Sequence, residues 1–144
     1  MSVDLWLVAT DLSDCSLAAC KEAARLAAAT ESRLLLLHVH LQEIVREEFA
    51  TGEVTAREQA KLTAKLEELK SALNDVYPNL PIDVDVLSST PVSGIIDEAD
   101  RLGVSNIVLG THGRKGLAHM VLGSVAEEVV RRAKVPVMVV KSVK

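Results

Sequence analysis

A run of glycines with two basic residues between them lies in the last third of the chain. The glycines of this run are Gly110, Gly113, Gly116 and Gly123. They lie between a short apolar segment, residues 106–109, and a helical pattern. Where a strand gives way to a helix, backbone N–H groups and the positive end of the helix dipole can meet an anion. Glycine also lets a bulky anion come close to the backbone. With the charges of Arg114 and Lys115, this run predicts a phosphate-binding loop.

Other groups of the same segment could take part in that loop. Thr111 and His112 stand between the first two glycines, and the hydroxyl of Ser124 could cap the helix or bond a phosphate oxygen. The spacing is not that of a P-loop, because Gly116 is followed by Leu117 where that motif needs lysine. No Gly-x-Gly-x-x-Gly follows the first strand either, so a dinucleotide fingerprint is absent. The alternative is purely structural: the glycines make a tight turn and Ser124 only caps a helix.

Three other pairs of residues could carry chemistry, and each has a simpler explanation. His38 and His40 share one face of a strand, but the sequence suggests no third metal ligand. Asp83 and Asp85 alternate along another strand, which is typical of a solvated face. Cys15 and Cys20 are five apart on a predicted helix and point to different faces, so we expect free thiols. No Ser/His/Asp or Cys/His catalytic set is suggested by placement.

Length and composition indicate one globular domain over residues 1–144. Apolar residues make up 49% of the chain and aromatic residues 2%, so the core must consist of Ala, Val, Leu and Ile. A net charge of −4 argues against nucleic-acid and anionic-membrane surfaces as partners. The first residues do not resemble a signal peptide, and no apolar run approaches the roughly 20 residues of a membrane span. We expect a cytoplasmic protein.

Apolar runs and helical periods alternate along the sequence. Strands are expected at residues 3–10, 34–39, 82–87, 107–109 and 134–140. Helices are expected from just after the capping residues 11–14 to about residue 30, at 53–76, at 91–102 and from about residue 121. Leu62, Leu66, Leu69, Leu73 and Val76 form the apolar seam of the second helix. Residues 41–53 match neither period clearly.

This alternation predicts a doubly wound α/β fold, Rossmann-like, with helices on both faces. Crossovers of such length join parallel strands right-handedly. The simplest result is one five-stranded sheet in the order 3-2-1-4-5, whose winding reverses between strands one and four. Asp11 ends strand one and Gly110 ends strand four, so both reach the predicted ligand crevice. Asp11 could accept from ribose hydroxyls, and Val39, at the end of strand two, is placed to meet an adenine.

The sequence resembles the universal stress protein family. The pattern Gly110-x2-Gly113-x9-Gly123-Ser124 matches that family's long glycine signature. The likeness extends through residues 122–127 and 135–140, and Thr10-Asp11 and the Leu-Leu-His-Val39 stretch are also similar. It covers essentially the whole chain, and the intact signature is similar to the ATP-binding branch of the family.

The resemblance implies a set of ligands and partners. The implied ligand is ATP, with AMP or ADP as alternatives and Mg²⁺ or Mn²⁺ on the phosphates. The implied site consists of Ala9, Thr10, Asp11, the Val39 backbone, Gly110, Thr111, His112, Gly113, Arg114, Lys115, Gly116, Gly123, Ser124 and Val125. It also implies a homodimer through Val137–Val140, with higher oligomers as an alternative, and a regulatory protein partner of unknown identity. Ala9 departs from the proline of many members, which loosens the loop but leaves Asp11 in place.

The expected function is therefore that of an ATP-binding regulatory protein of the stress response. Two alternatives remain open: a slow ATPase or phosphotransferase, and a dimeric interaction module without nucleotide. The sequence suggests no positioned general base, so at most weak hydrolysis is expected.

Overall fold

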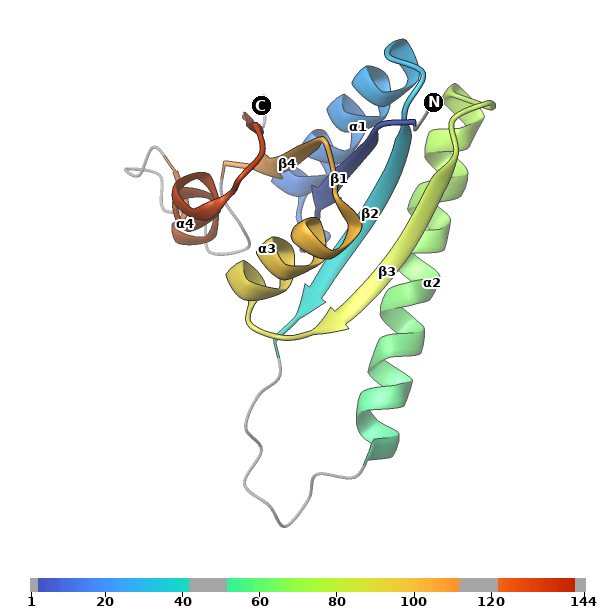
Figure 1. Cartoon of the computed structure of the whole chain (residues 1–144). Coiled ribbons are helices and arrows are strands. Elements are labelled where there is room, and N and C mark those ends of the chain that lie inside the picture. Colours follow the sequence, from blue (N-terminus) through green and yellow to red (C-terminus); the bar gives the residue numbers. More distant parts are fainter. Residues whose placement is uncertain (1–2, 42–51, 112–121, 142–144) are drawn as a thin grey trace.

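The computed structural model describes residues 3–41, 52–111 and 122–141, in which strands and helices alternate (Figure 1). The strands are β1 (Leu5–Ala9), β2 (Arg33–His40), β3 (Ile82–Ser88), β4 (Asn106–Gly110) and β5 (Val137–Val140). The helices are α1 (Asp14–Ala29), α2 (Gly52–Val76), α3 (Pro91–Leu102) and α4 (Ser124–Arg132).

Local sequence signals set most of these boundaries. The Ser13 side chain caps α1 by accepting the backbone N–H of Ser16. Pro91 opens α3, and Gly103 ends it in the left-handed conformation with φ 62°. Strand five was predicted from residue 134 but begins at Val137, because Pro136 has no N–H to donate to a sheet ladder.

The strands form one parallel sheet in the order β3-β2-β1-β4-β5, as predicted. β1 lies in the middle, with Leu7 opposite Leu35 of β2 and Ile107 of β4. β3 and β5 form the two edges. The alternating strand with Asp83 and Asp85 is therefore an edge strand, which accounts for its polar positions.

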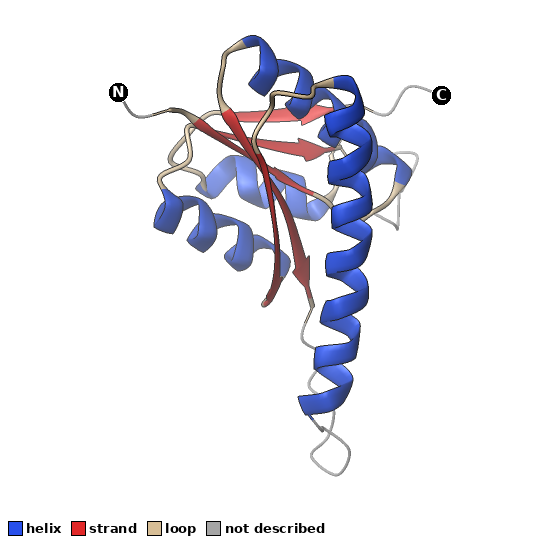
Figure 2. Cartoon of the chain, turned by 90° about the vertical axis from the view of Figure 1, so that its right-hand side faces the viewer, coloured by secondary structure: helices blue, strands red, loops and turns tan. Residues whose placement is uncertain are grey.

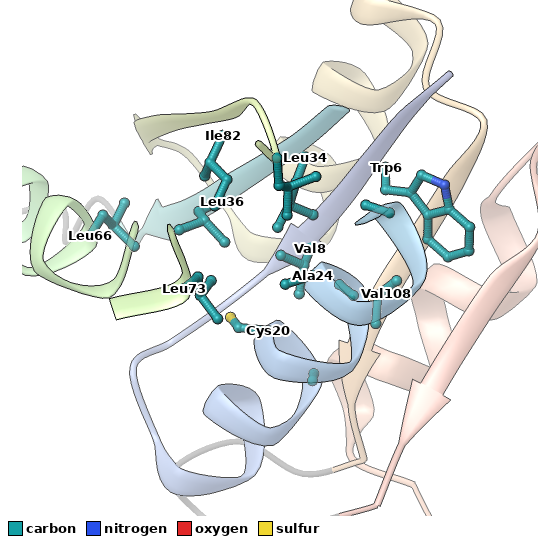
Figure 3. Close-up of a cluster of buried hydrophobic side chains, with 14 of the residues drawn as sticks. Trp6, Val8, Cys20, Ala24, Leu34, Leu36, Leu66, Leu73, Ile82 and Val108 are labelled. Carbon is teal, nitrogen blue, oxygen red and sulfur yellow. The ribbon is translucent and has the colours of Figure 1, made fainter. Parts of the chain in front are cut away.

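Two apolar cores lie on opposite faces of the sheet. The first packs α1 and α2 against alternate strand residues and is rich in alanines of α1; Figure 3 shows Trp6, Val8 and Ala24 within it. The second packs α3 and α4 against the intervening residues, such as Leu7. Both faces of the sheet are thus covered, which is why the central strands are almost continuously apolar.

Helix α2 is longer than the sheet that supports it. Figures 1 and 2 show its first turns extending past the carboxyl ends of β2 and β3. Leu66 and Leu73 are buried on the sheet, whereas residues 56–61 are exposed. The predicted seam is wrong at its end, since Val76 is 67% exposed. Over the described ranges, none of the helices combines the length and apolar character needed to span a bilayer.

Candidate functional site

The loops after β1 and β4 lead to opposite faces of the sheet. β1 continues into α1 in the first core, and its neighbour β4 is followed by α4 in the second. The winding therefore reverses between β1 and β4, as predicted. In doubly wound sheets, ligands bind outside the carboxyl ends of the strands at this point. β4 ends at Gly110, but β1 ends at Ala9, so Asp11 lies two residues beyond the strand rather than at its end.

Asp11 is held by hydrogen bonds within its own loop. Its Oδ1 atom accepts the backbone N–H of Ser13 and the hydroxyl of Ser16, each at 2.9 Å. Leu12 between them has φ 66°, a left-handed conformation that is costly for a bulky side chain. The N–H of Leu12 donates to Thr10 Oγ1 at 2.9 Å, which stabilises this turn. The loop after β1 thus carries its carboxylate in a defined conformation.

A buried histidine ties the end of β1 to β2. Nδ1 of His38 lies 2.7 Å from the carbonyl oxygen of Thr10. Because a carbonyl oxygen only accepts, Nδ1 carries a proton and donates it. The Nε2 atom of the nearby His40 lies 3.5 Å from a carboxylate oxygen of Glu58, in the second turn of α2. Within the described ranges, no three His, Cys, Asp or Glu side chains are grouped as a metal site.

Thr111 connects the end of β4 to three other elements. Its backbone N–H donates to the carbonyl oxygen of Val140 in β5 at 3.1 Å. Its own carbonyl oxygen accepts the N–H of Gly123, the cap of α4, at 2.6 Å. Thr111 Oγ1 also lies 3.5 Å from Sγ of Cys15 in the first turn of α1. The side chain is buried, so this junction is part of the packed domain.

A close contact between elements leaves little room for a side chain at Gly110. A Cβ atom there would lie 3.1 Å from both the carbonyl oxygen and Sγ of Cys15, which is tighter than ordinary packing. In the part of the chain that the structure describes, the glycine with positive φ is Gly103. Gly110 and Gly123 therefore do not use the left-handed conformation that is open to glycine.

Ser124 was predicted as a possible cap of α4, but the structure has Gly123 at the N-cap position. Gly123 is the N-cap, with φ −70° and ψ 161°, and Ser124 is the first helical residue. No side-chain cap bond forms, so Ser124 does not cap the helix. Ser124 and Val125 are exposed, and Glu127 adds a negative charge to the first turn. The exposed first turn remains able to direct N–H groups at an anion.

Val39 lies where β2 nears its end, opposite Leu87 of β3. Its side chain packs against α3 at Gly94, where an added Cβ would lie 2.8 Å from Val39 Cγ1. The other five predicted loop residues, His112, Gly113, Arg114, Lys115 and Gly116, lie outside the described residues.

Neither Cys15 nor Cys20 forms a disulfide, and the two thiols lie in different surroundings. Burial raises the pKa of Cys20 to about 12, and the nearby Asp11 charge acts in the same direction while the Thr10 hydroxyl opposes it. Cys20 therefore stays protonated inside the first core. Cys15 is half-buried against the end of β4.

The family model for the universal stress protein family matches residues 6–141 of the chain. The chain belongs to this family. The universal stress protein YxiE of Bacillus subtilis is 32% identical over 143 residues, which cover 94% of this chain and 97% of the relative. Among solved structures, protein MJ0577 of Methanocaldococcus jannaschii has a TM-score of 0.81 at 27% identity, covering 100% of this chain and 99% of that one. A universal stress protein solved in complex with cAMP has a TM-score of 0.74 at 26% identity, covering 99% and 100%.

Three further residues of this universal stress protein support the site and were missed in the sequence. They are Ser16, which bonds Asp11; His38, which bonds Thr10; and Gly94, which makes room for Val39. A glycine inside an amphipathic helix was a usable signal for Gly94, because it usually has a packing reason. The partners of His38 and Gly94 lie far away in sequence, so no local pattern could identify them.

Proposed function

We propose that this universal stress protein binds an adenine nucleotide at the ends of β1 and β4. ATP is the main ligand, with AMP or ADP as alternatives. The observation that carries the proposal is the hydrogen bond between Gly123 and Thr111, 2.6 Å long. It brings Thr111 and Gly123, near the two ends of the glycine signature, together at the first turn of α4. The relative solved with cAMP, which also contains adenosine, supports this ligand class.

Each part of the nucleotide has a proposed partner. Asp11 accepts from the ribose hydroxyls, the Val39 backbone meets the adenine, and Ala9 and Thr10 line the adenosine. The phosphates are held by residues 110–116 and by the N-terminus of α4 at residues 123–125. A helix dipole contributes only about 0.3–1 kcal/mol, so several N–H groups must act together. Mg²⁺ or Mn²⁺ would be carried on the phosphate oxygens, neutralising part of their charge.

Isothermal titration with ATP and Mg²⁺ tests the proposal directly. Wild-type protein should bind, and Gly113→Ala and Gly123→Val should bind more weakly while retaining the wild-type circular dichroism spectrum. The absence of binding at millimolar ATP would overturn the proposal. Unchanged affinity in both variants would contradict the role of the loop.

Two measurements separate the regulatory function from its alternatives. Mass spectrometry of gently purified protein should find co-purified adenine nucleotide, which an interaction module without nucleotide would lack. Phosphate release should not exceed that of the Gly113→Ala variant. Release well above this control would indicate an ATPase or phosphotransferase instead.

We also propose that two copies of the chain pair through β5. Its free edge carries half-buried Val137, Val139 and Val140, and Met138 is 38% exposed. The adjacent helix α4 exposes Val130. Pairing of two β5 strands would cover an apolar edge that otherwise invites uncontrolled association.

A further inference from the structure

Two buried hydroxyl groups, those of Thr10 and Ser16, form a hydrogen-bonded row that ends at the Asp11 carboxylate. The Ser16 side chain is only 5% exposed, yet its Oγ atom has polar neighbours on several sides. It lies 2.9 Å from Asp11 Oδ1, 2.8 Å from Thr10 Oγ1 and 3.0 Å from the carbonyl oxygen of Ser13. Ser13 Oγ is farther away, at 3.3 Å. Capping of α1 is the work of the Ser13 side chain, so these contacts of Ser16 call for another explanation.

The charge on Asp11 sets the direction of the hydrogen bonds. A carboxylate only accepts, and a bond to it is stronger than one to a neutral carbonyl. The single proton of the Ser16 hydroxyl is therefore directed at Asp11 rather than at Ser13. Thr10 in turn donates to Ser16, while Thr10 Oγ1 accepts the N–H of Leu12. Hydrogen bonds aligned in this way polarise and strengthen one another.

The Ser16 hydroxyl restricts the orientation of the Asp11 carboxylate. The terminal torsion of an aspartate is broad, so each donor that bonds the carboxylate narrows the range of orientations of its plane. The backbone N–H of Ser13 and the hydroxyl of Ser16 reach the same Oδ1 atom from two positions along the chain. Together they fix both the position of Oδ1 and the plane of the group.

We propose that Ser16 is a positioning residue that gives the site its preference for ribose hydroxyls. It acts through Asp11 and does not itself touch the ligand. With Ser16 in place, the Asp11 carboxylate meets the hydroxyls of a bound ribonucleotide without having to be ordered first. This inference rests on the proposed nucleotide site and adds the basis of its sugar selectivity.

The test compares ATP with 2′,3′-dideoxy-ATP, which lacks both hydroxyls, by isothermal titration. The variants are Ser16→Ala, Asp11→Ala and the double variant that carries both changes. Ser32→Ala is the matched control, because Ser32 is also buried and bonded to another hydroxyl, Thr30 Oγ1, but lies beyond the opposite end of α1. Ser16→Thr keeps the hydroxyl and should keep the selectivity. Thermal unfolding verifies that every variant is folded.

Wild-type protein should prefer ATP to the dideoxy analogue by about tenfold. Ser16→Ala should weaken ATP binding by about three- to tenfold and leave the analogue within about twofold. In the Asp11→Ala background the serine change should have no further effect, and Ser32→Ala should match wild type with both ligands.

Two results would overturn the positioning role while nucleotide binding stands. One is an equal loss for both ligands in Ser16→Ala, which would indicate a structural effect. The other is a further loss of ATP affinity when Ser16→Ala is added to Asp11→Ala. Wild-type protein that binds neither ligand would instead overturn the proposed function itself.

Discussion

The backbone N–H of Gly123 donates to the carbonyl oxygen of Thr111 at 2.6 Å, while the N–H of Thr111 donates to Val140 at 3.1 Å. A single residue thus links the end of β4, the first turn of α4 and the last residue of β5. The proposed phosphate loop and the proposed dimer strand share this junction. A change that displaces the end of β4 should therefore alter both nucleotide binding and dimerisation.

Gly110→Ala should lower the free energy of unfolding by about 1–3 kcal/mol, as expected for overpacking. The added Cβ would press on Sγ and on the backbone carbonyl of Cys15, and backbone atoms give way less easily than the end of a flexible side chain. Urea denaturation measures the loss. In a Cys15→Ala background, Gly110→Ala should cost less stability, because the contact with Sγ is gone while the contact with the carbonyl oxygen remains. Wild-type stability in Gly110→Ala would contradict the close contact.

Gly94→Ala should also be destabilising, although alanine is ordinarily the better residue inside a helix. Here the new methyl would meet Val39 Cγ1 at 2.8 Å, and we expect a cost of about 1–3 kcal/mol. In a Val39→Ala background the same change should be much less harmful, because the γ carbons are gone. A double-mutant cycle from denaturation curves measures this coupling, and strictly additive effects would exclude it.

Val139→Lys should convert the proposed dimer into a monomer, because it places a charge in the apolar edge of β5. Light scattering coupled to gel filtration gives the molar mass. Asp83→Lys is the control, since it puts the same side chain on the exposed face of the other edge strand, β3. The interface is refuted if Val139→Lys elutes as a normal dimer, or if both variants dissociate equally.

Stability should fall in alkaline solution through Cys20. Its pKa is raised from 9.0 to about 12 in the folded protein, so the unfolded chain loses its proton first. Below pH 9 both states hold the proton; above it the free energy of unfolding should fall by up to about 1.4 kcal/mol per pH unit until the folded thiol also ionises. Denaturation curves at increasing pH for wild type and Cys20→Ala measure the difference.

The expected result is a wild-type advantage over Cys20→Ala that shrinks as the pH rises. A constant difference between wild type and Cys20→Ala would contradict the raised pKa.

The sheet order and the position of the site could be predicted because both follow from sequence order and periodicity. Five apolar runs separated by crossover helices leave few topologies, and the reversal then has to fall between the first and the fourth strand. The cap of α4 could not be settled in this way. Gly123 and Ser124 are both acceptable N-caps, and spacing does not distinguish them.

The supporting contacts could not be predicted because they join distant parts of the chain. His38 reaches Thr10 only because β2 lies beside β1, and Gly94 matters only because α3 crosses Val39. Ser16 is close to Asp11 in sequence, but its role depends on the turn that the positive φ of Leu12 creates. Hydrophobic patterns say which face is buried and nothing about such polar partners.

Neighbouring residues of β1 belong to different layers: Trp6 packs with the alanines of α1, and Leu7 faces α3 and α4. A one-residue slip in strand pairing would exchange these side chains and spoil both layers at once. Misaligned forms should therefore be rare and short-lived during folding. Whatever ligand the chain binds, correct strand pairing brings the end of β1, which Asp11 follows, and the end of β4 at Gly110 to the same edge of the sheet.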